Sequence, residues 1–484
     1  MRAPITLGLL GLLGLLGTLA GGTAEAQIDS VPPHLGPPPS LTPPPMTERT
    51  LPNGLRLIVV EQHELPLADF VLLVNAGGAS DPPNRSGLAT LTADLLNEGT
   101  ATRSSLAIAD QTSYLGVQLG ASAAWDYSMV TLHTPTAQLD SALALFADVT
   151  LRPSFPQREF DRLKTERLTE LLQLRDEPTA VADRAFAQTL FGQNHPYGRP
   201  LGGSEATTRA MTRADVVGFW RAHYRPNAAT LIAVGDLTPD DVARRVARAF
   251  GAWQRGDVPA PVAPEAPNRG ATSVLLVDKP GAPQTSVRIG TVGVPRTTSD
   301  YFPLEVMNTI LGGSFTSRLN QNLRETHGFT YSAGSGFGMR RAAGPFIASA
   351  EVTGAKTDSS LVEFVRELKA IADTVPNAEL QKAKRYLELQ LPGEFETTGQ
   401  IAGMLVPLVV YGLPLDYYGA YVQRVDAITQ ADVQRVARQY LDTGHLVVVV
   451  VGDRKSIESG VRALNLGPVT VKQVVDVLGT GTVP

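Results

Sequence analysis

"NAGGASDPPNRSGLATLTADLLNEGT", residues 75–100, is the stretch on which the architecture depends. The apolar run "ADFVLLV" before it reads as a strand, and the glycines, prolines and asparagines that follow are typical of a turn. A buried helix is then predicted to begin after Gly87 and to end at Gly99. Three polar residues interrupt its otherwise apolar run: Thr90, Thr92 and Asp94. This helix is therefore the first candidate for a functional site.

The pattern around this stretch is repeated later in the chain. Three pairs of landmarks recur: the strands that begin at Leu55 and Ser273, the prolines Pro66 and Pro283 that precede strands, and the "VGD" segments that end at Asp236 and Asp453. The second member of each pair follows the first by 217 or 218 positions. A constant offset of this kind indicates an internal duplication.

Each half combines strands with long helices. Residues 127–134, "YSMVTLHT", alternate as a half-buried strand does, and residues 158–175 have the 3.6-residue period of a helix. We expect an α+β fold of two homologous halves, in which helices pack on mostly antiparallel sheets. Each half, at about 200 residues, is long enough for two similar α/β-sandwich subdomains.

Composition divides the chain into five segments: a signal peptide at 1–26, a proline-rich linker at 27–48, an N-terminal half at 49–255, a second proline-rich linker at 256–270, and a C-terminal half at 271–484. The signal peptide is predicted from Arg2, an apolar run and the small-x-small pattern ending at Ala26. A retained membrane anchor is the alternative, although the apolar run is short for a stable span.

The composition also excludes several classes of protein. The formal net charge of −5 argues against a nucleic-acid-binding protein, which would present a basic face. The absence of cysteine removes disulfides, thiolate metal sites and cysteine nucleophiles. A secreted chain without cysteine is compatible with the periplasm of a Gram-negative-type bacterium.

The order of strand, glycine-rich turn, helix and "NEGT" resembles the zinc-peptidase half of peptidase family M16, which includes pitrilysin, insulinase and the mitochondrial processing peptidases. The resemblance extends from about Leu51 to Leu464. It implies a metallohydrolase fold with its halves arranged as a clamshell. In active members the helix carries His-x-x-Glu-His, which binds zinc and activates water. Here the corresponding residues are Thr90, Ala93 and Asp94, and a later glutamate ligand corresponds to Glu170.

These residues make a poor zinc site, because zinc prefers imidazole and thiolate ligands. None of the seven histidines has a second histidine at helix-face spacing. We therefore expect no cofactor on this chain. Two alternatives for the polar positions are a water-filled cavity and a hard cation such as calcium held by Asp94 and Glu170.

A second motif lies in "LGGSFTSRLNQNLRETHGFTYSAGSGFG", residues 311–338. A helix is predicted with Ser314 or Thr316 as its cap, with Phe315, Leu319 and Leu323 on its buried face, and with Gly328 at its end. The resemblance implies that Arg324 and Tyr331 reach across to a peptide held at zinc. A tyrosine hydroxyl can stabilise an oxyanion, and a guanidinium can hold peptide carbonyls. Without the resemblance, an ordinary ion pair and an edge-strand aromatic explain both residues. The glycines at 334, 336 and 338 indicate room for a peptide at a sheet edge.

One branch of the family works as heterodimers, in which one subunit carries the zinc motif and the other supplies the arginine and tyrosine. This chain fits the second role. We expect a non-catalytic, substrate-binding subunit of a secreted zinc endopeptidase, with a zinc-motif subunit and unfolded peptides as its partners. An inert peptide-binding or scaffold protein of the same fold is one alternative. An autonomous hydrolase is another, although no nucleophile elbow is present.

Overall fold

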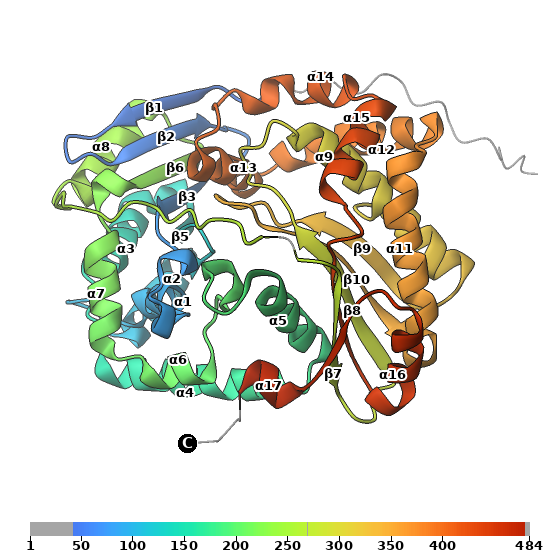
Figure 1. Cartoon of the computed structure of the whole chain (residues 1–484). Coiled ribbons are helices and arrows are strands. Elements are labelled where there is room, and N and C mark those ends of the chain that lie inside the picture. The colour runs from blue at the N-terminus through green and yellow to red at the C-terminus, as the bar shows by residue number, and fades with distance from the viewer. Residues whose placement is uncertain (1–41, 269, 480–484) are drawn as a thin grey trace, which may run out of the picture. The chain divides into compact units, whose positions relative to one another are not determined.

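The computed structural model describes residues 42–268 and 270–479 (Figure 1). The predicted signal peptide and most of the first predicted linker lie outside these residues. In the described chain each half forms one six-stranded sheet. The strands of the first sheet are, in spatial order, β1 (Met46–Thr50), β2 (Arg56–Glu61), β6 (Ala229–Gly235), β3 (Leu67–Val74), β5 (Ser128–Pro135) and β4 (Gln118–Ala123).

The second sheet repeats this order. Its strands are β12 (Val469–Gln473), β7 (Ser273–Asp278), β11 (Val447–Gly452), β8 (Gln284–Val292), β10 (Pro345–Thr353) and β9 (Thr330–Phe337). The two sheets differ at one edge, where β1 is antiparallel to β2 but β12 is parallel to β7. Most of the other pairings are antiparallel. The duplication and the α+β class are confirmed, but each half contains one sheet where two subdomains were predicted.

Helices follow the strands in both halves. The first half contains α1 (Leu88–Asp94), α2 (Ser105–Leu115), α3 (Leu139–Leu151), α4 (Gln157–Gln173), α5 (Pro178–Phe191), α6 (Glu205–Ala210), α7 (Arg213–His223) and α8 (Pro239–Phe250). The second half contains α9 (Tyr301–Leu311), α10 (Arg318–Asn320), α11 (Thr357–Asp373), α12 (Asn377–Gln390), α13 (Thr398–Tyr411), α14 (Tyr421–Asp426), α15 (Gln430–Tyr440), α16 (Arg454–Ala463) and α17 (Val474–Leu478). The described part of the second predicted linker contains neither helix nor strand.

The two halves exchange a helix. Helix α5 belongs to the first half by sequence, yet it packs on β8 and β11 of the second sheet. Figure 1 shows it beside β8. Helix α13 belongs to the second half and packs on β3 and β6 of the first sheet. Each sheet is therefore covered on one face by a helix from the other half. The halves of the described chain share their cores and do not form two separate folding units.

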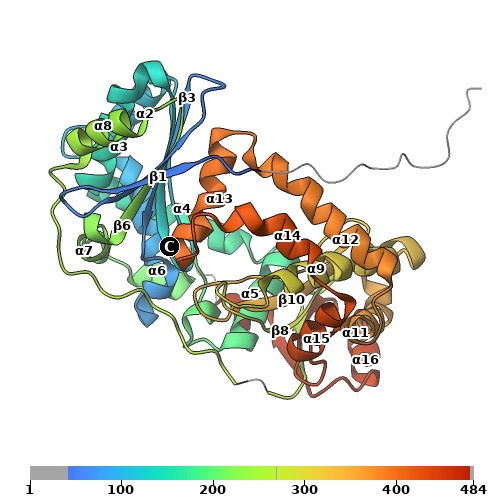
Figure 2. The same ribbon diagram turned by 90° about the horizontal axis from the view of Figure 1, so that it is seen from above.

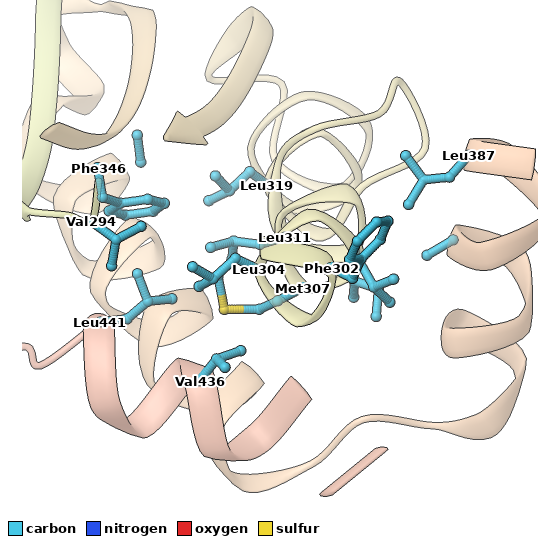
Figure 3. Close-up of a cluster of buried hydrophobic side chains, with 14 of the residues drawn as sticks. Val294, Phe302, Leu304, Met307, Leu311, Leu319, Phe346, Leu387, Val436 and Leu441 are labelled. Carbon is cyan, nitrogen blue, oxygen red and sulfur yellow. The ribbon is translucent and has the colours of Figure 1, made fainter. Parts of the chain in front are cut away.

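Buried aliphatic and aromatic side chains hold the second half together. Figure 3 shows part of this core, where Leu304 and Met307 of α9 lie on the side of Phe346 and Val436, and Phe302 lies on the other side, toward Leu387 of α12. Figure 2 shows α9, α11 and α15 gathered in the same region, seen from above. No helix of the described residues combines the length and the hydropathy that a bilayer span requires.

Candidate functional site

Helix α1 begins at a buried carboxylate. Gly87 adopts a left-handed φ of 92° before the first turn, which glycine accepts without strain. The Asp81 carboxylate accepts hydrogen bonds from the backbone N–H groups of Gly87, Leu88 and Ala89 at 2.8, 3.1 and 2.9 Å. These are donors that the start of a helix otherwise leaves unpaired. Burial raises the pKa of Asp81 to about 7, although the backbone donors lower it in part.

Replacing Asp81 with alanine is expected to lower the free energy of unfolding by about 2–4 kcal/mol, because three buried N–H groups lose their acceptor. The raised pKa gives this effect a pH dependence. Because the folded protein holds the proton up to about pH 7, the carboxyl's contribution is largest at acidic pH and is lost as the pH rises toward 7. Urea unfolding of both proteins at pH 5 and pH 8 measures the difference.

The matched control is alanine at Asp110, an exposed aspartate on α2. That substitution is expected to change stability by less than about 0.5 kcal/mol at either pH. The difference in free energy of unfolding between wild type and Asp81→Ala should shrink from pH 5 to pH 8. An increase in that difference would contradict the assignment of a raised pKa.

The predicted zinc-ligand positions lie on this helix. The Thr90 hydroxyl donates to the backbone oxygen of Leu201 at 2.9 Å, so the loop beside the helix already engages it. Ala93 is fully buried and offers no ligand atom. Thr92 donates to the backbone oxygen of Leu88 within the helix at 2.7 Å. Of the three zinc-motif positions on α1, only Asp94 retains a side chain that metals favour.

An arginine joins Asp94 to Glu170. The Nη2 atom of Arg167, on α4, lies 3.0 Å from an Asp94 carboxylate oxygen. Its Nη1 atom lies 3.3 Å from an oxygen of Glu170, one turn along the same helix. Gly202 gives the guanidinium room, because a Cβ there would stand 3.1 Å from Nη1. Burial raises the pKa of Asp94, and the neighbouring positive charge of Arg167 counteracts part of that rise.

The structure thus brings two of the predicted positions, Asp94 and Glu170, together around one positive charge. That charge is the guanidinium of Arg167. A zinc ion does not fit this arrangement, because imidazole ligands are missing and a fixed positive charge lies between the two carboxylates. The same charge disfavours calcium. Among the described residues, no three histidine, aspartate or glutamate side chains are grouped as metal ligands.

Arg167 is the site residue that sequence reasoning missed. Its spacing of three residues from Glu170 was the available signal, because such residues lie side by side on a helix.

The loop around His195 holds a histidine with a structural role. The backbone N–H of Tyr197 donates to its Nδ1 at 3.0 Å, so Nε2 carries the proton and donates to the backbone oxygen of Glu265 at 2.9 Å.

The second predicted site contains an arginine between two aromatic rings. Arg324 lies in a π-helical turn, Gln321–Thr326, a feature found disproportionately at functional sites. Its guanidinium carbon is 4.5 Å from the centre of the Phe315 ring and 5.1 Å from that of Tyr331. Both rings are exposed, Phe315 at 64% and Tyr331 at 84%. Contacts of this kind orient a guanidinium. Its Nε also lies 3.3 Å from a carboxylate oxygen of Glu325, as the alternative of an ion pair predicts, so the two Nη groups are the donors that a ligand would meet.

Tyr331 stands at an irregular point on the outer strand of its sheet. Thr330 pairs with Val352 and Ala333 with Ala350, so Tyr331 and Ser332 together lie opposite Glu351. An extra residue of this kind turns a side chain away from its regular direction. Strand β9 has no neighbour on its outer side in the described sheet. A Cβ added at Gly336 would meet no atom within 4 Å, so the space there is open.

The predicted helix in this segment is partly wrong. The chain forms a short α-helical turn, Arg318–Asn320, with Ser317 before it, and not a helix capped at Ser314 or Thr316. Leu319 and Leu323 are fully buried as predicted, but Phe315 precedes the helix and is exposed. Gly328 ends the segment with a φ of 62°, as expected of a glycine stop.

Two family models match the chain. Residues 56–205 match the model described as insulinase (peptidase family M16), and residues 210–387 match the peptidase M16 inactive domain. A crystal structure of a peptidase M16 inactive domain from Pseudomonas fluorescens superposes with a TM-score of 0.77 at 28% identity, and covers 84% of this chain and 98% of that one. This chain therefore belongs to peptidase family M16.

Relatives in the family include proteins named as zinc proteases and a protein named as a non-peptidase homolog. An uncharacterized zinc protease of Streptomyces coelicolor is 30% identical over 58% of this chain, and the match spans 62% of that protein's length. A protein of Helicobacter pylori named as a non-peptidase homolog is 23% identical over 82% of this chain and 92% of its own length. Within the family this chain is of the type that lacks the metal-binding motif.

Proposed function

We propose that this chain is the non-catalytic, substrate-binding subunit of a secreted M16-type zinc endopeptidase. The observation that carries the proposal is the contrast between its two sites. At the first site the zinc ligands are replaced, and Arg167 forms ion pairs with the two carboxylates that remain. At the second site Tyr331 is exposed, and the partly exposed Arg324 lies against its ring and pairs with Glu325. A partner chain with an intact motif would hold the zinc, and this chain would hold none.

The chemistry assigned to this chain is limited to binding and orientation. The outer edge of β9 offers unpaired backbone groups to an extended, unfolded peptide, which can join the sheet as a further strand. Arg324 can hold carbonyl groups of that peptide, and the Tyr331 hydroxyl can donate a hydrogen bond to an oxyanion formed in the partner's active site. Secretion is part of the proposal and depends on the signal peptide predicted at residues 1–26, which lie outside the described residues.

Peptide hydrolysis tests the proposal. The mature chain is assayed alone and mixed with a zinc-motif M16 subunit from the same organism. Activity is expected only in the mixture, because only the partner has zinc ligands. In the mixture, Arg324→Ala and Tyr331→Phe are each expected to lower kcat/KM by about 100-fold, the loss typical of one oxyanion-stabilising donor. Tyr331→Phe keeps the ring beside Arg324 and removes only the hydroxyl.

The controls are Tyr114→Phe, at a tyrosine that is 88% exposed on α2, and Arg366→Ala, at an exposed arginine on α11. Neither is expected to change activity. Chelator-sensitive hydrolysis by the isolated chain would overturn the proposal. Full activity of both site variants in an active mixture would favour the alternative of an inert peptide-binding or scaffold protein.

A further inference from the structure

A cavity of about 590 Å³ lies in the first half, and its lining residues belong to neither site described above. It lies among α3, α7, α8 and the residues that follow α7 and α8. Its size falls within the range of small-molecule sites. The apolar residues Leu143, Ala147, Trp220, Tyr224 and Trp253 all line it. Neither proposed site uses any of these residues.

The side chains of Trp220 and Trp253 offer the cavity apolar ring surface and no free N–H group. Trp220 donates its ring N–H to the backbone oxygen of Thr150 at 3.0 Å, and Trp253 donates to that of Tyr224 at 3.1 Å. Their only polar atoms are therefore already satisfied within the protein. Tyr224 and Trp253 are 2% and 7% exposed, so the surrounding structure holds both rings in place. An apolar ligand would meet a preformed aromatic wall.

The charged side chains that line the cavity are mostly positive, whereas the chain as a whole has a negative net charge. The charged side chains around the cavity are five arginines, Arg152, Arg221, Arg225, Arg245 and Arg248, and one aspartate, Asp140. The whole chain has a formal net charge of −5. Arg152 and Arg245 have carboxylate partners at 2.7 and 2.6 Å. Among the described residues, Arg248 has a long contact of 3.8 Å with Asp140, and Nε of Arg225 is buried without a hydrogen-bond partner.

The duplication supplies an internal comparison. The counterparts of α3, α7 and α8 in the second half are α11, α15 and α16, and α11 packs directly against α15. In the first half α3 packs on α8 and much less on α7. Trp220 of α7 corresponds, 217 positions later, to the fully buried Ala437 of α15. The large indole that lines the cavity therefore stands where the second half has a small, buried alanine.

We propose that this cavity binds the free acid of a long-chain aliphatic compound, that is, a fatty acid. The tail would lie against the aromatic and aliphatic wall, and the carboxylate would meet the arginines, whose forked N–H groups match its geometry. This inference is independent of the proposed peptidase role.

Intrinsic fluorescence tests the proposal. The chain has three tryptophans, and two of them, Trp220 and Trp253, line the cavity. The third, Trp125, packs instead against Arg340 at 4.4 Å. Titration of the mature protein with dibromostearic acid is expected to quench the emission, and the quenching is expected to persist in Trp125→Phe. Each CH₂ added to an unbrominated competitor is expected to strengthen binding by up to about fourfold until the cavity is full.

Two sets of variants test the binding of the aliphatic tail and of the carboxylate separately. Ala144 lines the cavity and is exposed, so Ala144→Phe should fill the space without disturbing the core. It is expected to abolish quenching, whereas Ala109→Phe on the exposed face of α2 should not. The double variant Arg221→Glu with Arg248→Glu is expected to weaken acid binding by about tenfold or more. Arg158→Glu, at an arginine that is 93% exposed elsewhere, is its control.

Three outcomes would overturn the proposal. The first is the absence of saturable quenching. The second is equal affinity for dibromostearic acid and its methyl ester, with no effect of the arginine reversals, which would leave an apolar cavity without a role for charge. The third is a perturbation of Trp220 and Trp253 by an acidic amphipathic peptide but not by the fatty acid, which would make the cavity a protein-docking groove.

Discussion

Rebuilding the zinc motif on α1 is expected to create a zinc site only when Arg167 is removed as well. Thr90→His, Ala93→Glu and Asp94→His place two imidazoles four residues apart on one helix face, as the metal requires. In the triple variant, however, the Arg167 guanidinium still lies 3.3 Å from Glu170, and its charge repels a dication. Adding Arg167→Ala frees Glu170 as a further ligand. We expect the fourth substitution to raise zinc affinity by about 100-fold or more.

Zinc affinity is measured by competition with a chromophoric chelator and checked by elemental analysis, so the result does not depend on catalysis. Arg158→Ala, on the same helix, provides the matched control, because Arg158 is 93% exposed and its ion pair with Glu159 is long, at 4.0 Å. Added to the triple variant, it should leave zinc binding unchanged. Equal zinc affinity of the triple and quadruple variants would show that Arg167 does not block the site.

Phe186→Ala is expected to lower the free energy of unfolding by about 3–5 kcal/mol, the usual cost of removing a buried aromatic ring. Phe186 lies on α5 and is 3% exposed in a core formed with Val277 and Val449 of the second sheet. Its ring fits over Gly290, where a Cβ would approach to 2.8 Å. Urea unfolding followed by circular dichroism measures the change.

Because α5 joins the first half to the second sheet, the substitution is expected to shift one cooperative transition. Leu405→Ala, at a fully buried residue of the exchanged helix α13, should act in the same way, with a loss of about 2–5 kcal/mol. Leu106→Ala, at a residue that is 70% exposed, is the control and should cost less than about 0.5 kcal/mol. Two separate transitions, of which Phe186→Ala moves only one, would contradict the shared core.

Local features of the fold could be predicted from the sequence because they depend on neighbouring residues. The helix after Gly87 and the stop at Gly328 follow from the backbone preferences of glycine, and both are found. Phe315 was misplaced because a spacing of four residues was read as one regular helix. The segment instead combines a short α-turn with a π-helical turn, and Phe315 lies before both.

Long-range features could not be predicted in this way. The Arg167–Asp94 ion pair joins two residues that are 73 positions apart in the sequence, and nothing near either residue specifies its partner. The constant offset of 217 positions showed that the halves are alike, but it did not show which sheet each helix covers. The packing of α5 and α13 on opposite sheets depends on how the two halves fit together, which a repeat pattern does not encode.

The helix exchange also sets an order of events during protein synthesis. The last strand of the first sheet, β6, ends at Gly235, and the helix that covers this sheet, α13, begins only at Thr398. At a typical rate of about 5–20 residues per second, the ribosome needs roughly 8–30 s to make the intervening chain. Throughout that interval an apolar face that includes Val71 and Ile232 has no cover from its own chain. The nascent first half is therefore a natural client for chaperones until the second half is made.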